Sequence, residues 1–285
     1  MHLFQKTILK PLIFSGVGLH SGESVVIKLL PAPENSGINF IYKNKKIEAL
    51  WKNAIISQLC TKLKKNNLYL STIEHLMSAL SGLGVSNIIV KISSSEIPIM
   101  DGSSKDFVEK ILEDGLKKQN KEIKFIKVRK KISFTAENKY IEIEPTNKKK
   151  LIIDYTIDYQ DEFIKKQNLI YEHSEENYME IYKARTFCLH KDLEKIFSLG
   201  LAKGGSLDNA IVVSGKKILN QGGLRYDNEF VKHKILDCVG DLYLAGSHII
   251  GKLKTFGGGH ELNLMILKEL FKNKSNFEII NSSSV

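Results

Sequence analysis

The chain contains few cysteines, and they lie far apart. Cys60, Cys188 and Cys238 have neither the spacing of a zinc finger nor that of a CxxC redox motif. Nothing in their pattern indicates a disulfide framework, so a reducing cytoplasm is the expected compartment. A small buried hydrophobic role is the simplest interpretation of Cys60 and Cys238.

Arginine is scarce in a chain that is otherwise strongly basic. The formal net charge is +10, yet only Arg129, Arg185 and Arg225 are arginines among 42 basic residues. Because arginine makes most bidentate contacts with phosphate and guanine, its scarcity weakens the case for nucleic acid as a partner. We interpret most of the charge as solvated surface, part of which can attract an anionic nucleotide sugar.

Long apolar runs are absent as well. No run reaches the ~18 residues that a membrane helix needs. The mildly apolar residues 1–14 are interrupted by Lys6, Lys10 and Pro11, and no signal-peptide cleavage pattern follows. We therefore expect no stable membrane insertion. The chain has 285 residues, 42% of them hydrophobic, which is enough for about two domains with buried cores.

Apolar patterns predict strands and helices in both halves of the chain. Strands are expected at 25–30, 38–42, 47–51, 87–92, 125–132, 140–144, 151–157, 210–213 and 217–219. Helices are expected at 71–84, 105–114, 176–183, 228–242 and 262–271. The Lys-rich residues 115–124 have no apolar period and are interpreted as a linker. This order predicts an α+β fold with domains at 1–121 and 122–285.

One segment, residues 228–241, carries half of a possible metal site. His233 and Asp237 are four residues apart, so they share one face of a helix. A neutral imidazole and a carboxylate on one face are typical ligands of catalytic zinc. Asp241 lies one turn further, where a carboxylate can orient another catalytic group. The alternative is an ordinary His/Asp pair on a surface helix.

Two further segments supply complementary groups. Ser71 or Thr72 is expected to cap the helix that begins there, with Glu74 near its N3 position and His75 in its first turn. The alternative is that Glu74 only completes a capping box. Three glycines precede His260, and they permit positive φ and a close approach of backbone to a ligand. The alternative is a flexible turn with an incidental histidine.

Together these segments resemble the UDP-3-O-acyl-N-acetylglucosamine deacetylase family, the zinc hydrolases of lipid A synthesis. The resemblance covers essentially the whole chain and rests on several blocks in the same order, which is far more specific than one short motif. The blocks are residues 13–22, 71–80, 98–103, 184–187, 204–212, the His233 helix and the His260 loop.

The resemblance implies an architecture and a set of roles. Two α+β domains of similar topology would each have a layered β-α-α-β arrangement, with helices packed between sheets, a small extra sheet in the first domain and a βαβ insert at about 189–224 in the second. His75, His233 and Asp237 would bind one Zn²⁺, or Fe²⁺ in the cell because similar sites can take it. The remaining catalytic roles would fall to Glu74 as base, His260 as acid, Thr186 as oxyanion donor and Asp241 as the partner of His260.

Substrate contacts are expected from four places. Lys234 is a candidate for the diphosphate, and Asp158 and Tyr159 for the uridine. Leu19 and His20 lie in a loop that is expected to border the site. The acyl chain is expected in the insert, and the candidates for its wall are Leu193, Leu207 and Val212. Phe187 is a further substrate-binding candidate. Core packing is the alternative for the apolar residues, and a solvated lysine is the alternative for Lys234.

The sequence also departs from the family pattern. Many members have a lysine three residues before the catalytic histidine, where this chain has Gly257, and Gly258 replaces a serine. One phosphate contact is therefore in doubt, and Lys254 is the nearest lysine that can compensate. Cys188 replaces a frequent glycine, which can reshape the mouth of the acyl passage.

The expected function is zinc-dependent hydrolysis of the N-acetyl group of UDP-3-O-acyl-N-acetylglucosamine, the committed step of lipid A synthesis, by a cytoplasmic monomer. One alternative is a zinc amidohydrolase for another acylated amino sugar. A second is a non-catalytic basic binding protein, against which the joint presence of Glu74, His75, His233, Asp237 and His260 argues.

Overall fold

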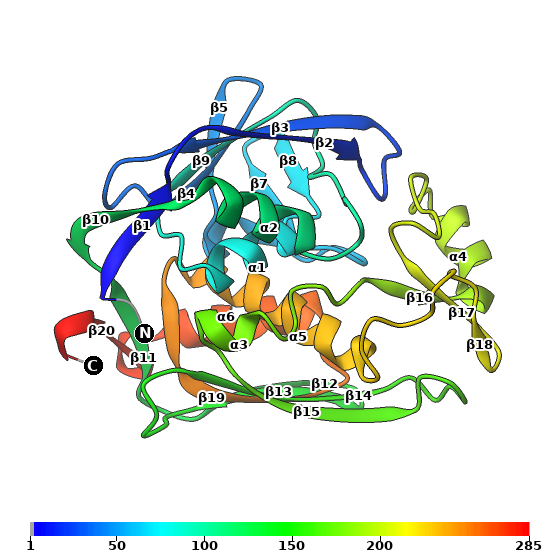
Figure 1. Ribbon diagram of the computed structural model, residues 1–285. Helices are drawn as coiled ribbons and strands as arrows, with labels where there is room; N and C mark the ends of the chain where they lie inside the picture. Colours follow the sequence, from blue (N-terminus) through cyan, green and yellow to red (C-terminus); the bar gives the residue numbers. More distant parts are fainter. Residues whose placement is uncertain (1–2, 285) are drawn as a thin grey trace.

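The computed structural model describes residues 3–284 and shows a mixed α+β fold, as predicted. Helices lie between two larger sheets (Figure 1). The principal helices are α1 (Glu74–Gly82), α2 (Lys105–Asp114), α5 (Glu229–Leu242) and α6 (His260–Lys272). Within these described residues, no helix is long and apolar enough to cross a membrane.

The first half of the chain builds a five-stranded sheet with the order β2-β3-β9-β4-β5. Its strands alternate between buried and exposed side chains because one face covers the helices. Its bounds are β2 (Leu12–Val17), β3 (Ser24–Pro31), β9 (Ile88–Ile92), β4 (Ile38–Tyr42) and β5 (Lys45–Glu48). A separate three-stranded sheet joins β6 (Ala54–Ile55), β7 (Lys62–Lys65) and β8 (Leu68–Ser71).

The second half builds a seven-stranded mixed sheet around one long central strand, β19 (His248–Phe256). β19 pairs in parallel with β11 and β14 and antiparallel with β13. The other members are β11 (Lys124–Val128), β12 (Ile132–Ala136), β13 (Lys139–Glu144), β14 (Leu151–Asp158), β15 (Lys166–Glu172) and β20 (Phe277–Asn281). The buried face of this sheet covers α5 and α6 from below in Figure 1.

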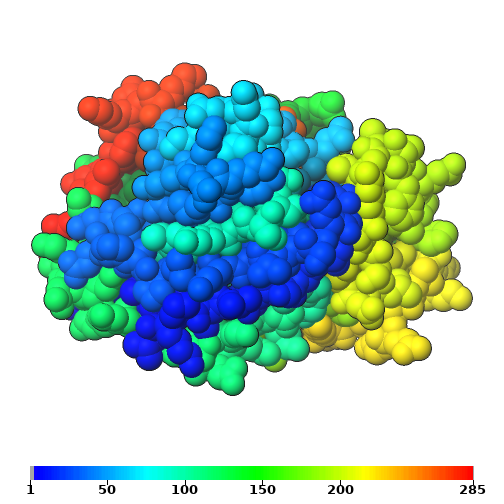
Figure 2. Space-filling view, turned by 90° about the horizontal axis from the view of Figure 1, so that it is seen from above, coloured from blue at the N-terminus to red at the C-terminus, as the bar shows by residue number. Residues whose placement is uncertain are grey.

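A βαβ unit projects from one side of the molecule. Its parallel strands β16 (Phe187–Leu189) and β17 (Ile211–Ser214) are connected through α4 (Leu193–Ser198), and β18 (Lys217–Ile218) extends the sheet. Figure 2 shows these residues as a lobe beside the body of the molecule. The unit begins at Phe187, two residues before the insert that the sequence predicts.

The predicted linker at 115–124 is wrong. Residues Leu116–Glu122 form β10, which pairs antiparallel with β1 (Phe4–Ile8). The side chains of β10 are mostly exposed on both faces, so the strand lacks the apolar alternation by which a sequence reveals a strand. The domain boundary between residues 121 and 122, and the related topology of two domains, stay predictions.

Two helix predictions also need correction. Neither Ser71 nor Thr72 caps α1: Ser71 belongs to β8, and α1 follows Ile73 without a side-chain cap. Thr72 has φ +57°, a strained value for a β-branched residue, and its hydroxyl donates to Glu96 Oε1 at 2.8 Å. The helix predicted at 176–183 is shorter, because α3 covers only Glu175–Tyr178 and turns follow it.

Close packing of α1 on α5 places the functional side chains. Gly240 lies in the last turn of α5, and a Cβ at this position would be 2.1 Å from the carbonyl oxygen of Glu74. A glycine costs helix stability of about 1 kcal/mol relative to alanine. At this position its missing side chain lets the two backbones approach, and the first turn of α1 then packs against the last turn of α5.

Candidate active site

Three side chains able to bind a metal meet between α1 and α5. His75 comes from the first turn of α1, and His233 and Asp237 come from consecutive turns of α5. One ligand atom of each residue lies within 4.8 Å of the other two, and all three side chains are buried. Nε2 of each histidine is 3.4 Å from Asp237 Oδ1. Helical spacing predicted the α5 pair, the family resemblance added His75, and the packing of α1 on α5 brings the three together.

The donor atoms of this cluster fit a divalent metal ion. Asp237 Oδ1 is buried, and within residues 3–284 it has no hydrogen-bond partner. His233 Nδ1 lies 3.1 Å from the carbonyl oxygen of Ala184, and donation to that oxygen leaves the Nε2 lone pair facing Asp237. Burial lowers the pKa of His233 to about 3, so its ring is neutral, as a metal ligand must be.

Lys234 supports the cluster from the next position of α5. Its Nζ is 2.7 Å from Asp237 Oδ2 and 5.8 Å from the centroid of the Phe187 ring. Burial opposes the charge of the lysine, but Asp237 more than offsets this and raises the pKa of Lys234 above its ordinary value. Lys234 is therefore a cation held at the edge of the cluster, and its contact with a diphosphate stays a prediction.

Glu74 and His260 face the same space from the first turns of α1 and α6. Glu74 Oε1 is 3.8 Å from His260 Nε2, and the same Nε2 is 3.9 Å from Asp237 Oδ2. Burial raises the pKa of Glu74 to about 7. Burial alone would lower the pKa of His260, but the Asp241 and Glu74 carboxylates raise it to about 9. A carboxyl group whose pKa is near neutral pH and an imidazole that is protonated at neutral pH thus lie beside the candidate ligands.

Asp241 orients His260. His260 Nδ1 is 2.8 Å from Asp241 Oδ2, and that oxygen also accepts a hydrogen bond of 2.9 Å from Asn263 Nδ2. The other carboxylate oxygen accepts from the hydroxyl of Thr61. Asp241 is 2% exposed, so its charge is balanced by these donors rather than by water.

Thr186 directly precedes β16, and its backbone is hydrogen-bonded to two other segments, at Gly102 and at Ile211. Its backbone N–H donates to the carbonyl oxygen of Gly102 at 2.7 Å, and its own carbonyl accepts from Ile211 N at 2.8 Å. Gly102 has φ +85°, and a Cβ there would be 2.1 Å from the carbonyl oxygen of Asn209. Just before Thr186, the buried Arg185 forms an ion pair with Glu229 at the start of α5.

Phe187 links the metal-ligand cluster to the predicted uridine residues. Its ring centroid is 6.1 Å from that of His233 and 5.2 Å from that of Tyr159. Tyr159 follows β14 and is 37% exposed, so one part of its ring packs and another part faces solvent. Asp158 ends β14, and its Oδ1 accepts from the backbone of Gln160. The structure brings Tyr159 and Phe187 together, while their contact with uridine stays a prediction.

Leu19 and His20 lie in a loop that touches the projecting βαβ unit. The backbone of Gly204 donates to the Leu19 carbonyl at 3.0 Å, and the backbone of Ala202 lies 3.4 Å from His20 Nδ1. The backbone N–H of His20 donates to the buried Glu96. Burial lowers the pKa of His20. The loop therefore contacts the βαβ unit, which is where the sequence predicts the acyl chain.

The three predicted wall residues of the acyl passage differ in exposure. Val212 is 7% exposed in β17, Leu193 is partly buried in α4, and Leu207 is 47% exposed in the loop before β17. Phe197 and Leu199, which the sequence did not single out, are 53% and 52% exposed at the end of α4. The burial of Val212 fits core packing as well as a passage, so the acyl site stays a prediction.

Of the glycines before His260, Gly257 has the expected positive φ, whereas Lys254 does not have its expected role. Gly257 has φ +62°, and a Cβ at Gly258 would be 2.6 Å from the hydroxyl oxygen of Thr255. Lys254 is exposed, whereas its neighbour Thr255 is buried on the helix side of β19. Because side chains alternate along a strand, Lys254 points away from the site. The expectation that it replaces the missing lysine is wrong.

Two residues of the site were missed from the sequence. Thr61 and Asn263 both donate to Asp241 from elements distant in the chain. Asn263 is a buried polar residue three positions after His260, on the same face of α6, and this spacing was a usable signal. Thr61 precedes a short strand in a lysine-rich segment, where no pattern marks it.

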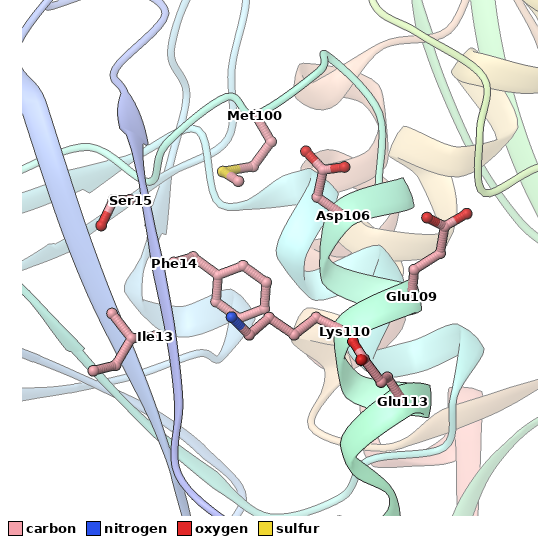
Figure 3. A pocket seen from close by; sticks show the side chains of 8 residues that line it. All are labelled: Ile13, Phe14, Ser15, Met100, Asp106, Glu109, Lys110 and Glu113. Carbon is pink, nitrogen blue, oxygen red and sulfur yellow. The ribbon is translucent and has the colours of Figure 1, made fainter.

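A surface hollow of about 350 Å³ lies elsewhere, between β2 and α2. Figure 3 shows Asp106, Glu109 and Glu113 along α2, with Lys110 extending toward Phe14. The Lys110 ammonium is 5.5 Å from the centroid of the Phe14 ring. None of the predicted site residues lines this hollow, so it is separate from the candidate active site.

Comparisons with known proteins agree with this geometry. The model of the family "UDP-3-O-acyl N-acetylglycosamine deacetylase" matches residues 5–272. A protein of Wigglesworthia glossinidia brevipalpis named UDP-3-O-acyl-N-acetylglucosamine deacetylase is 43% identical over 288 residues, which cover 96% of this chain and 94% of the relative. Proteins with the same name in Nitratiruptor sp. and Campylobacter lari are 39% and 40% identical and cover 98% and 97% of the chain and 94% of each relative. The chain therefore belongs to the UDP-3-O-acyl N-acetylglycosamine deacetylase family.

Proposed function

We propose that this protein hydrolyses the N-acetyl group of UDP-3-O-acyl-N-acetylglucosamine in lipid A synthesis, giving acetate and the free 2-amine. The observation that carries the proposal is the meeting of His75, His233 and Asp237 with Glu74 and His260 in one buried space. Such a set combines metal ligands, a base and an acid. An N-acetyl amide needs all three, because it is a poor electrophile with a poor leaving group.

His75, His233 and Asp237 are the proposed ligands of one Zn²⁺, with Fe²⁺ as the alternative ion. When bound, the ion polarises the acetyl carbonyl and lowers the pKa of water. Three protein ligands are the usual number for catalytic zinc, since one position stays open for water or substrate. Among the described residues, Asp237 Oδ1 has no hydrogen-bond partner, and it is buried between two imidazoles, so its negative charge favours a bound cation.

Glu74 is the proposed base. It takes a proton from the attacking water while the water oxygen forms a bond with the acetyl carbon. Its buried position raises its pKa to about 7, which makes it a better proton acceptor than an exposed glutamate. The Thr186 hydroxyl donates to the oxygen that becomes negative, a contribution often worth about 3 kcal/mol per donor.

His260 is the proposed acid. It gives the proton at Nε2 to the sugar nitrogen as the carbon–nitrogen bond breaks, so the amine leaves neutral rather than as an anion. Asp241 holds the ring through Nδ1 and keeps it protonated. Nε2 is the nitrogen that faces Glu74 and Asp237, which places the proton on the side of the reacting bond.

The remaining site residues are proposed to bind the substrate. Tyr159 would stack on the uracil ring, Asp158 would hydrogen-bond the uridine, and Lys234 would neutralise the diphosphate. Phe187 lies between these groups and the metal-ligand cluster. Leu193, Leu207 and Val212 of the βαβ unit are proposed to receive the acyl chain. Leu19 and His20, in the loop against this unit, are proposed to border the site.

The setting of the reaction is also proposed. All three cysteines are free, which fits a reducing cytoplasm. The nucleotide head of the substrate is soluble, so the enzyme does not need to insert into a membrane to reach it. Every proposed catalytic group comes from one chain, so a monomer suffices.

Purified protein tests the function directly: metal analysis should find one ion per chain, and UDP-3-O-acyl-N-acetylglucosamine should release acetate. Absence of acetate release from the metal-loaded protein would reject the proposal.

A further inference from the structure

Thr61 contacts three of the residues assigned roles above, although it belongs to none of the helices that carry them. It is 7% exposed and directly precedes β7. Its backbone N–H donates to Glu74 Oε2 at 3.0 Å, and its hydroxyl donates to Asp241 Oδ1. The same hydroxyl oxygen is 3.1 Å from His260 Nδ1. One residue therefore joins α1 through its backbone, and α5 and α6 through its side chain, at the reacting groups.

The direction in which the Thr61 hydroxyl donates determines whether His260 Nδ1 carries a hydrogen. A hydroxyl has one proton to donate and two lone pairs, and a carboxylate can only accept. The Thr61 proton is therefore used on Asp241, so the side of Oγ1 that faces His260 can only accept. Both close neighbours of His260 Nδ1, Asp241 Oδ2 and Thr61 Oγ1, are then acceptors. This arrangement requires a hydrogen on Nδ1 and leaves Nε2 as the nitrogen that exchanges a proton with substrate.

The backbone N–H of Thr61 gives the two carboxylate oxygens of Glu74 different surroundings. Oε2 is occupied by the Thr61 N–H, whereas Oε1 is the oxygen that lies 3.8 Å from His260 Nε2. A base with one oxygen held and the other directed at the reacting space loses less freedom when it takes a proton. The hydroxyl and the N–H of one residue thus orient the acid and the base relative to each other.

We propose that Thr61 is a positioning residue for the hydrolysis, an inference that rests on the proposed function. Its hydroxyl holds Asp241 and His260 so that His260 presents its transferable proton at Nε2. Thr61 touches neither substrate nor metal ligand in this account, so its removal should slow the chemical step and leave binding unchanged.

The test replaces the hydroxyl while keeping the shape of the side chain. Thr61→Val removes the donor, and Thr61→Ser keeps it. We expect Thr61→Val to lower kcat by roughly ten-fold or more, the effect of losing one buried hydrogen bond to a charged group. KM and metal content should stay at wild-type values, and Thr61→Ser should keep most of the activity. Thr7→Val is the matched control, since Thr7 in β1 is also buried and its hydroxyl oxygen accepts a hydrogen bond from the backbone N–H of Ala32, just after β3.

Three results would overturn the proposal. The first is a kcat of Thr61→Val within two-fold of wild type. The second is a parallel loss of metal and activity, which would make Thr61 a structural residue. The third is failure of both Thr61→Val and Thr61→Ala to fold while Thr7→Val folds, which would show the same.

A spectroscopic measurement tests Thr61 without an activity assay. In protein labelled with ¹⁵N-histidine, His260 should show a hydrogen-bonded proton on Nδ1, identified by its loss in His260→Gln. The resonance should move in Thr61→Val and stay in place in Thr61→Ser and Thr7→Val. Absence of an Nδ1 proton in wild type would overturn the inference. If the wild type released no acetate but showed this resonance pattern, the proposed function would fail and the role of Thr61 in holding His260 would stand.

Discussion

His260 Nδ1 lies 2.8 Å from Asp241 Oδ2, which directs the other ring nitrogen toward Glu74 and the metal-ligand cluster. We predict that His260→Ala lowers kcat by ~10²-fold or more while the metal stays bound, because a general acid typically contributes that much. Steady-state kinetics with metal analysis checks this. A near-normal rate that persists at high pH would mean that another group is the acid.

Glu74 and His260 should give a bell-shaped dependence of kcat/KM on pH. Glu74 is active when deprotonated, so activity falls as the pH drops below its pKa, which burial raises to about 7. His260 is active when protonated, so activity falls as the pH rises through about 9, the value that results when Asp241 and Glu74 outweigh the effect of burial. A bound cation favours the charged form of Glu74, so the acidic limb should lie below 7 in the loaded enzyme. Glu74→Gln should lose ~10²-fold in kcat and the acidic limb with it.

Removal of the metal should abolish activity without unfolding the chain. The ligands His75, His233 and Asp237 sit on two helices that already pack on each other through a large core, so the site does not need the ion to form. A chelator should remove one ion per chain, and added Zn²⁺ should restore the rate. Circular dichroism before and after chelation provides the control. Full activity in metal-free protein would contradict the assignment of these three ligands.

The projecting βαβ unit should govern the preference for acyl length. If the acyl chain binds there, each lost buried CH₂ should cost roughly 0.8 kcal/mol in kcat/KM. Leu207 is 47% exposed, so Leu207→Trp should fold normally and impair long-chain substrates more than short ones. Val212→Trp should do the same but at a stability cost of about 1–3 kcal/mol, because Val212 is buried. Ile170→Trp, at an exposed position on β15, is the control, and equal losses for all chain lengths would place the acyl chain elsewhere.

Gly240→Ala should separate α1 from α5. The added Cβ would lie 2.1 Å from the Glu74 carbonyl oxygen and 2.9 Å from the backbone nitrogen of Ser78, so backbone has to move. Although alanine is the better helix former, we expect a loss of stability of about 1–3 kcal/mol, typical of overpacking, and weaker metal binding. Thermal unfolding and metal titration measure the two effects. Alanine at Gly259, where a Cβ would meet nothing within 4 Å, provides the control.

Local patterns in the sequence predicted what depends on neighbouring residues. The period of an α-helix places His233, Asp237 and Asp241 on one face of α5, and the helix over Lys105–Asp114 has the bounds that its apolar pattern indicates. The family resemblance added His75, Glu74 and His260, because blocks in a fixed order carry information that one motif lacks.

Only the tertiary structure decided which distant groups meet. Thr61 reaches Asp241 across 180 positions, and β10 pairs with β1 although its own side chains show no strand pattern. The direction of Lys254 followed from the register of β19, which a sequence slip of one residue would reverse. These features arise from contacts between segments far apart in the chain, and no local period in the sequence records them.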